Sequence, residues 1–275
     1  AGYSFLRTRA NFGVSIEQVP FYRYLGGGRF LMPIGGQPVP VLANVFERDV
    51  IRTAQGMMSY PFSTFRRFEL GASATYIKRD RLYRGYMISG QPINEDERLF
   101  DATFFQPVAA LVFDNSLFGW TGPIYGRRYR LQASRTFGDY EFTEVLVDFR
   151  NYMNWKRRVV FATRLLGLTR IGRDADWFTL FWGGPYFLRG YDGGSFDLNS
   201  RECTDYSDLN GGSVSPCPVR DQLIGSSAAV MNLELRFPII KELQIGFLGS
   251  FPPADAVLFF DGAVAWDNEV CMALD

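Results

Sequence analysis

The segment GGPYFLRGYDGG, residues 183–194, places a single arginine among aromatic side chains and five glycines. Arg189 carries a permanent charge and a planar fork of N–H donors, so away from water it needs a carboxylate partner. Glycine loses the most conformational freedom on folding, and a cluster of glycines marks tight turns or close backbone approach. The segment predicts either a buried ion pair in a turn-rich loop or an arginine in a solvated hairpin turn.

The chain lacks histidine and the motifs that mark a catalytic serine or a zinc site. None of its 275 residues is histidine, which excludes Ser-His-Asp and Cys-His catalysis and imidazole metal sites. The serines of GASAT (residues 71–75) and GGSVS (residues 211–215) lie beside glycine but lack the context of a nucleophile elbow. No CxxC pair supports a zinc site. These absences argue against an enzyme.

Two of the three cysteines are placed to form a disulfide. Cys203 and Cys217 flank the polar, glycine-rich stretch TDYSDLNGGSVSP, which reads as one loop. A disulfide that closes about 15 residues stabilises by roughly 3 kcal/mol in the chain-entropy model and implies an oxidising compartment. The alternative is two free thiols in a loop, and Cys271 is left over in either case.

Charge and hydropathy narrow the class of protein. The formal net charge is zero, so no global field attracts nucleic acid, and no nucleic-acid partner is expected. No apolar run of about 18 residues is present, so a transmembrane helix is not expected. Aromatic residues make up 16% of the chain, and the length suits one large all-β domain or two smaller ones.

Period-two alternation of apolar and polar residues dominates the chain. The clearest segments are AVMNLELRFP, EVLVDFRNY and RRFELGASATYIKRD. Such alternation indicates half-buried strands, either of a soluble sandwich or of a transmembrane barrel whose apolar face meets lipid. Aromatic residues near strand ends and strands recurring about every 20 residues favour the barrel.

The alternation predicts strands over 56–78, 103–114, 127–137, 141–152, 157–169, 175–183, 225–237, 242–249 and 254–266. The first 55 residues are harder to assign, because YLGGGRFLMPIGGQPVPV has too many glycines and prolines for one regular strand. Two short strands and a loop are expected there. No helical stretch and no linker are expected.

The arginine segment resembles the arginine-glycine-aromatic signature of the BamA/TamA superfamily of outer-membrane assembly and translocation barrels. The matching residues, in order, are Gly183, Gly184, Leu188, Arg189, Gly190 and Tyr191. In that family the motif lies at the tip of a long extracellular loop that folds back into the barrel lumen. The resemblance implies that Arg189 pairs in the lumen with Glu234, Asp261 or both, as a structural ion-pair lock.

The neighbouring segments add to the resemblance. VFDNSLFGWTGPIYGRRYRLQAS is similar to the family's hairpin, with Asp114, Pro123 and Gly126 at the motif positions. NLELRFP resembles the strand after the motif loop and supplies Glu234. LFFDGAVAWD resembles the next strand and supplies Asp261, although the family usually has one residue between this acid and its glycine.

The resemblance implies an all-β, transmembrane antiparallel β-barrel with sixteen strands, of which about eleven to thirteen are expected here. Residues 1–275 are expected to form a single, incomplete barrel domain without the N-terminal soluble module and the closing C-terminal strands. The implied location is the outer membrane of a Gram-negative bacterium. The implied function is insertion or translocation of proteins, without a cofactor or enzymatic activity. The implied partners are the lipid bilayer, lipopolysaccharide, and unfolded outer-membrane protein clients or accessory subunits.

Other functions remain open from the residues alone. A passive channel or a structural barrel subunit of a larger outer-membrane complex is the main alternative, with lumen charges such as Arg150, Arg164, Glu144 and Asp148 along an aqueous path. Glu234 and Asp261 would suit acid/base chemistry as a carboxylate pair, but an arginine between them favours an ion pair. A soluble β-protein is the third alternative.

Overall fold

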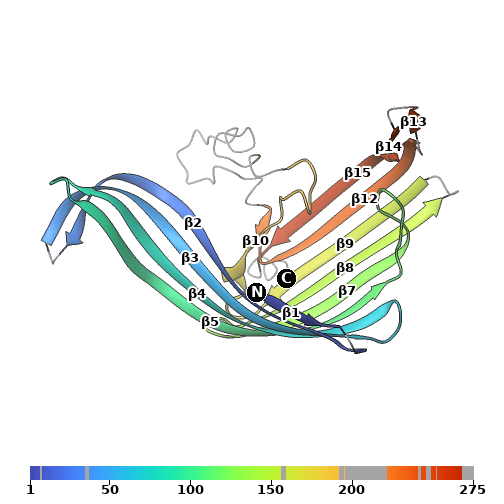
Figure 1. The fold of residues 1–275 in the computed structure, drawn as a ribbon, viewed down its shortest axis with the longest axis horizontal. Coiled ribbons are helices and arrows are strands. Elements are labelled where there is room, and N and C mark those ends of the chain that lie inside the picture. Colours follow the sequence, from blue (N-terminus) through green and yellow to red (C-terminus); the bar gives the residue numbers. More distant parts are fainter. Residues whose placement is uncertain are drawn as a thin grey trace, which may run out of the picture. The chain divides into compact units, whose positions relative to one another are not determined.

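The computed structural model describes residues 1–6, 8–34, 37–155, 159–191, 195, 222–240, 243–245, 249–251 and 253–267 (Figure 1). Nearly all of these residues lie in antiparallel strands, and the prediction of an all-β antiparallel chain is confirmed. Among the described residues, the one helix is a short 3-10 helix, η1 (Ala175–Phe178). No helix in the described part of the chain is long and apolar enough to cross a membrane.

One eleven-stranded sheet contains most of the strands, in the order β1-β2-β3-β4-β5-β7-β8-β9-β12-β15, with β6 paired to β7. Strands β10 and β11 form a second, small sheet, and β13 and β14 form a third. The bounds are β1 Gly2–Phe5, β2 Asn11–Ile34, β3 Gln37–Pro61, β4 Arg66–Met87, β5 Pro92–Asp114, β6 Leu117–Phe118, β7 Pro123–Gly138, β8 Phe142–Trp155, β9 Val159–Ile171, β10 Leu180–Phe181, β11 Ile224–Gly225, β12 Ser227–Ile240, β13 Leu243–Ile245, β14 Gly249–Phe251 and β15 Ala254–Trp266.

The chain divides into two compact units. The first consists of Ala1–Met58, Gly71–Pro107 and Thr136–Tyr140, and the second of Ser59–Leu70, Val108–Arg135 and Glu141–Asp275. The first unit carries ion pairs between neighbouring strands. Arg48 and Lys78 both donate to Asp80, at 2.7 and 2.8 Å, and Asp80 is itself buried. Burial of a carboxylate requires such pairing, because desolvation of an unpaired charge is costly.

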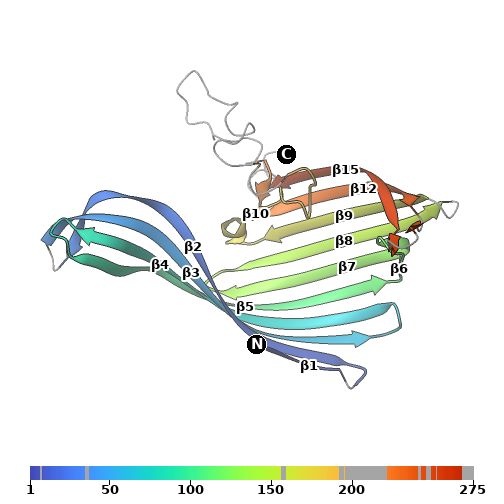
Figure 2. The same ribbon diagram turned by 45° about the horizontal axis from the view of Figure 1, so that its top comes forward.

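The second unit contains the predicted site, on strands β8, β9, β12 and β15. These strands run side by side in Figures 1 and 2, and each is hydrogen-bonded to the next. β8 and β9 are paired from Thr143↔Ile171 to Trp155↔Val159, and β12 and β15 from Ser227↔Trp266 to Ile240↔Ala254. Antiparallel pairing over such lengths fixes which side chains lie next to one another on each face.

The two faces of these strands have the reverse of the soluble pattern. On β12, Met231 and Leu235 are 37% and 38% exposed, whereas Asn232 on the opposite face is only 9% exposed. Val145 on β8 and Leu165 on β9 are exposed in the same way. The apolar face is therefore open and the polar face covered. A soluble sandwich covers its apolar face, whereas barrel strands turn that face to lipid.

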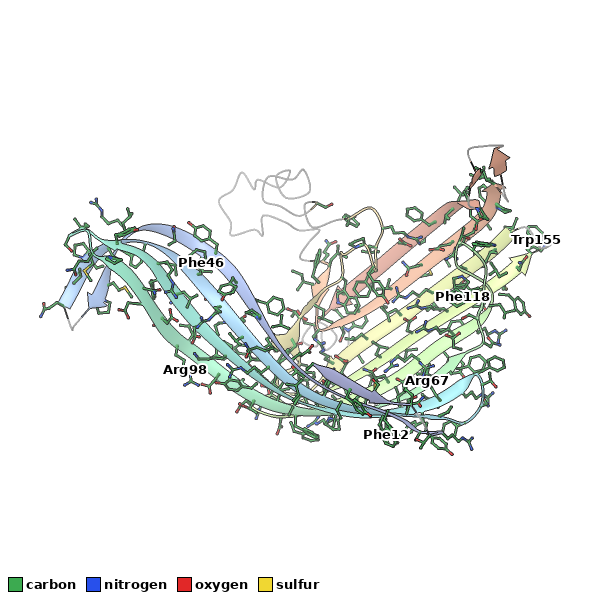
Figure 3. All side chains as sticks on the ribbon, viewed as in Figure 1. Phe12, Phe46, Arg67, Arg98, Phe118 and Trp155 are labelled. Carbon is green, nitrogen blue, oxygen red and sulfur yellow. The ribbon has the colours of Figure 1, made fainter. Side chains whose placement is uncertain are left out.

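Large aromatic side chains lie exposed at strand ends. Trp155 ends β8 and is 66% exposed, and Phe118 lies in β6 next to the turn before β7 (Figure 3). Trp120, in that turn, is also exposed. Such amphipathic or apolar rings favour the interface between lipid and water.

Several predicted strand ranges were wrong. The range 56–78 contains a turn between β3 and β4, where Ser63 Oγ accepts hydrogen bonds from the N–H groups of Phe65 and Arg66 at 3.3 and 3.2 Å. Phe62 N–H also donates to Arg66 O at 2.9 Å. The serine hydroxyl thus supplies local acceptors that end the ladder. The range 242–249 corresponds to the short paired strands β13 and β14 rather than to one strand.

The expected strand over 175–183 is mostly η1 followed by the two-residue strand β10. The alternation of DWFTLFW mimics a strand, but i→i+3 hydrogen bonds form instead, from Ala175 N–H to Gly172 O and from Trp177 N–H to Asp174 O, both at 3.3 Å. Gly172 has φ of +143°, which turns the chain out of β9.

Two short strands and a loop were expected in the first 55 residues, but the strands there are long. They contain β1, β2 of 24 residues and most of β3, which has 25 residues. Gly26 has φ of +140° and lies within β2, and Pro38 and Pro40 lie at the beginning of β3. A proline near a strand end removes few ladder hydrogen bonds, so neither feature stops the long strands.

Candidate functional site

The loop between β9 and β12 carries the arginine segment, and its two ends are held together. β10 pairs with β11 through Leu180↔Gly225 and Phe181↔Ile224. Next to this pair, Trp182 N–H donates to Leu223 O at 2.8 Å, and the Trp182 side chain is only 2% exposed. The base of the loop is therefore anchored by a short sheet and a buried tryptophan.

Trp182 lies in a small apolar core on the covered face of the sheet. Its partners there are Leu166 and Leu168 of β9 and Ala228 and Val230 of β12. Its ring centroid lies 4.8 Å from that of Phe187, within the arginine segment. Burial of so large a ring orders the loop against the strands, because aromatic side chains remove more apolar surface from water than other residues.

Three glycines of the segment have different structural roles. A Cβ on Gly183 would lie 2.5 Å from the Phe181 ring, so no larger residue fits without a shift. The Gly184 carbonyl accepts hydrogen bonds from the N–H groups of Phe187 and Leu188, both at 2.9 Å, which closes a tight turn. Gly190 has φ of +95°, a conformation that favours glycine. This turn presents Arg189 to β12 and β15.

Arg189 is bound by two carboxylates. Its Nε donates to Asp261 Oδ2 at 2.7 Å and its Nη2 to Asp261 Oδ1 at 2.6 Å, a bidentate contact. Its Nη1 donates to Glu234 Oε1 at 2.5 Å, and its backbone N–H to Asp261 Oδ2 at 2.9 Å. The hydrogen bond to Asp261 raises the pKa of the Arg189 guanidinium above its ordinary value. Charge-assisted bonds of this kind fix orientation as well as adding stability.

Three further side chains support the contact. Asn232 Nδ2 donates to Asp261 Oδ1 at 2.9 Å and to the carbonyl of Phe187 at 2.7 Å, so it joins the strand, the acid and the loop. Arg236 Nε donates to Glu234 Oε2 at 2.6 Å. The ring of Phe259 lies 4.1 Å from the guanidinium carbon of Arg189, a cation–π distance.

Strand register explains why these residues meet. Asn232 pairs with Asp261 across β12 and β15, and Glu234 pairs with Phe259 two residues further on. Residues two apart on a strand share a face, so the acids, the amide and the ring all lie on one face. The acids and the amide are largely covered there, whereas Phe259 is 53% exposed. Their side chains converge where the loop delivers Arg189.

The structure brings Arg189, Glu234 and Asp261 together, with Leu188 buried beside them. Gly183, Gly184 and Gly190 shape the turn, and Tyr191 lines a cavity of about 510 Å³ together with Leu188 and Asp261. Cys203 and Cys217 lie outside the described residues, as do residues 192–194 of the segment. The predicted disulfide therefore stays a prediction.

Local contacts hold the predicted hairpin that contains Asp114, Pro123 and Gly126. Asp114 Oδ1 accepts from Ser116 N–H at 3.0 Å. Gly126 has φ of +106°, and a Cβ there would lie 2.5 Å from the carbonyl oxygen of Asn115. The carbonyl of Pro123 accepts from Arg236 Nη1 at 3.3 Å, which connects this hairpin to β12.

Sequence reasoning missed Asn232, Arg236, Phe259 and Trp182 as site residues. A signal was present for three of them. Asn232 and Arg236 alternate with Glu234 in NLELRFP, and Phe259 lies two residues before Asp261, so each shares a face with a predicted acid. Nothing local indicated Trp182, because its burial depends on strands far away in the sequence.

Among the residues that the structure describes, no cluster of acidic, cysteine or histidine side chains could hold a metal ion. What the arrangement can do chemically is hold a loop: a guanidinium, two carboxylates and an amide form a connected network of charge-assisted hydrogen bonds.

Comparison with known proteins gives the family and the fold of the chain. Residues 52–273 match the Omp85 superfamily domain. No curated protein matches the chain. The crystal structure of BamA from Haemophilus ducreyi lacking POTRA domains 1-3 is similar with a TM-score of 0.57 at 16% identity, over 96% of this chain and 53% of that one. The chain thus spans about half the length of that structure and shares its β-barrel fold. It belongs to the Omp85 superfamily.

Proposed function

We propose that the chain is the membrane-spanning barrel part of an outer-membrane protein that inserts or translocates other proteins. The observation that carries the proposal is the contact of Arg189 with Asp261 and Glu234, on a chain that belongs to the Omp85 superfamily. The BamA structure is similar in fold. The named residues act as structural groups rather than as catalysts.

The proposed role of the contact is to hold the β9–β12 loop against the covered face of the strands. The side chain of Asp261 is only 4% exposed, so its charge depends on Arg189 for compensation. Removing one partner of a buried pair leaves an uncompensated charge and costs about 3–5 kcal/mol. The loop therefore keeps one position while a client protein passes or inserts.

The proposed surroundings are the lipid bilayer and lipopolysaccharide of a Gram-negative outer membrane. The exposed apolar face of β8, β9 and β12 supports this, since contiguous apolar surface needs a nonpolar neighbour. The aromatic residues at strand ends, such as Trp155, suit its interface. Unfolded outer-membrane proteins or accessory subunits are the proposed partners.

A passive channel or structural subunit is the second candidate. It is favoured by the charges on the covered face of β8 and β9, where Arg150 and Asp148 pair at 2.7 Å beside Arg164. Charges of both signs along a wet lumen are common in channel barrels. They carry ions without acting on a client.

A reconstitution experiment separates the two candidates. The protein is purified from its membrane and placed in liposomes, a urea-unfolded outer-membrane barrel is added, and its insertion is followed by heat-modifiable migration and protease protection. We expect faster insertion than in empty liposomes, and slower insertion with Arg189→Ala. Arg173→Ala, an exposed arginine in the turn before η1, is the control. Ion conductance without any gain in client insertion would establish the passive channel instead.

A further inference from the structure

The covered face of the second unit contains a row of polar residues that crosses three strands. Arg150 on β8 pairs with Arg164 on β9, and Arg164 pairs with Asn232 on β12. Two arginines therefore lie directly opposite each other. Like charges in this position destabilise a strand pair, so the arrangement needs negative charge from elsewhere.

Among the described residues, the carboxylates of this region carry less negative charge than its arginines require. Arg150 donates to Asp148 through Nε at 3.0 Å and Nη2 at 2.7 Å. Arg164 makes a longer contact with the same carboxylate, through Nη2 at 3.4 Å. In the same region Arg189 donates to both Glu234 and Asp261, and Arg236 donates to Glu234. The four arginines and three carboxylates of this region sum to one excess positive charge, 4 − 3 = 1.

Two buried polar atoms here have no hydrogen-bond partner among the described residues. One is a donor, Nε of Arg164, and the other is an acceptor, Oδ1 of Asn232. The amide nitrogen of Asn232 already donates to Phe187 O and Asp261 Oδ1, so its orientation is set. Unpaired buried polar groups are rare in folded proteins and need an explanation. Both atoms are covered by protein in this structure, so a ligand with acceptor and donor groups would satisfy both after a small shift of the side chains around them.

These residues surround a cavity of about 270 Å³, here called the arginine cavity. Its lining includes Arg150, Arg164, Tyr186, Arg189, Asn232 and Arg236. Tyr186 borders it from the loop, with its ring 4.7 Å from the guanidinium carbon of Arg164 and its carbonyl accepting from Arg164 Nη1 at 3.1 Å. A hydrogen bond from Arg150 to the Tyr186 hydroxyl lowers the pKa of this tyrosine, in keeping with a positive surrounding.

We propose that the arginine cavity binds a phosphate group that retains a P–OH, either free phosphate or the monoester headgroup of a lipid. Arginine forks match phosphate oxygens bidentately. The phosphate oxygens accept from Arg164 Nε and from Arg150, and the P–OH donates to Asn232 Oδ1. The negative charge offsets the excess positive charge of the two opposed arginines.

A carboxylate ligand fits less well. An ionised carboxylate only accepts hydrogen bonds, so it would leave Asn232 Oδ1 unpaired. Phosphate has more acceptor oxygens, arranged tetrahedrally, and these can reach arginines on different strands. The difference makes competition by acetate a direct test of the ligand class.

The test is calorimetric titration of the purified protein, in a detergent buffer free of phosphate, with sodium phosphate and with dihexanoyl phosphatidic acid at constant ionic strength. We expect saturable binding of at least one of the two probes. Arg164→Lys keeps the charge and removes the Nε donor, and it should weaken binding at least tenfold, as should Arg164→Gln. Arg173→Gln, which removes an exposed charge outside the cavity, should bind like the original protein.

Each outcome decides the proposal. Binding of inorganic phosphate identifies a free anion as sufficient, and binding of the phosphatidic acid alone identifies a lipid headgroup. Binding that acetate displaces at equal concentration would replace phosphate by a carboxylate and overturn the assignment. No saturable binding of either probe, or equal loss in the Arg173 control, would also overturn it. Arg164→Lys retains a cation at this position, so the test does not depend on whether Arg164→Gln folds.

Discussion

Asp261 accepts hydrogen bonds from both the backbone N–H and the side chain of Arg189, a residue 72 positions earlier in the chain. One carboxylate therefore binds both the backbone of the loop and the side chain of its arginine. The backbone bond forms only when the turn at Gly184 and Gly190 has its observed shape. Loop geometry and ion pairing depend on each other.

Replacement of Arg189 should destabilise the protein. Arg189→Ala leaves Asp261 buried without a counter-charge, and we expect a loss of about 3–5 kcal/mol. Arg189→Lys keeps the charge but not the planar fork, so its loss should be smaller. Thermal unfolding, read as heat-modifiable migration on gels, measures both. Unchanged migration of Arg189→Ala would contradict the lock, and Arg173→Ala serves as the exposed control.

The two acids should not be equivalent. Asp261 accepts three bonds from Arg189 and is 4% exposed, whereas Glu234 accepts one from Arg189 and is 18% exposed. Asp261→Asn should therefore lower the unfolding temperature more than Glu234→Gln, because the more buried, more bonded charge contributes more. Thermal unfolding of the two variants side by side gives the order. An equal or reversed order would show that the bidentate contact is not the main one.

The ring of Phe259 should contribute to the site through the face that Arg189 contacts. Phe259→Leu removes the cation–π contact while keeping apolar bulk, and we expect a loss of about 0.5–1 kcal/mol. Phe260→Leu is the matched control, because Phe260 points to the opposite, exposed face. Denaturant unfolding of both variants measures the difference. Equal effects would assign the change to lost apolar area alone.

The base of the loop should depend on Trp182. Trp182→Ala opens a cavity among Leu166, Ala228 and Val230, and we expect a loss of about 3–5 kcal/mol. Trp177→Ala removes an exposed tryptophan of η1 and should have little effect. Protease cleavage within the loop, followed by mass spectrometry, reports the loosening. A Trp182→Ala loop as resistant as the original would remove the anchoring role.

The cysteine prediction is tested by peptide mapping. Digestion without reduction should yield a crosslinked peptide that contains Cys203 and Cys217, because closing a loop of about 15 residues costs only modest chain entropy. Reduction should split it, and this provides the internal control. Alkylation of both thiols in the native protein would show that no disulfide forms.

The fold class was predictable because alternation is a local property. In NLELRFP and EVLVDFRNY every second side chain must point to the same face whatever the rest of the chain does. The aromatic strand ends and the arginine segment indicated the family, and the match of residues 52–273 to the Omp85 superfamily domain confirms it. The failures were also local in origin. Ser63 ends a strand with its own hydroxyl, and the alternating DWFTLFW forms a 3-10 turn because its hydrogen bonds form locally rather than across a ladder.

The sequence by itself determined which residues share a face, so Asn232, Glu234 and Arg236 were certain to be neighbours on one strand. It also placed Arg189 in a glycine-rich turn. Only the tertiary structure decided which residues stand opposite them: Asn232 between Arg164 and Asp261, and Glu234 beside Phe259. Register depends on the pairing of strands far apart in the chain, and a slip of one residue would turn every one of these side chains to the other face.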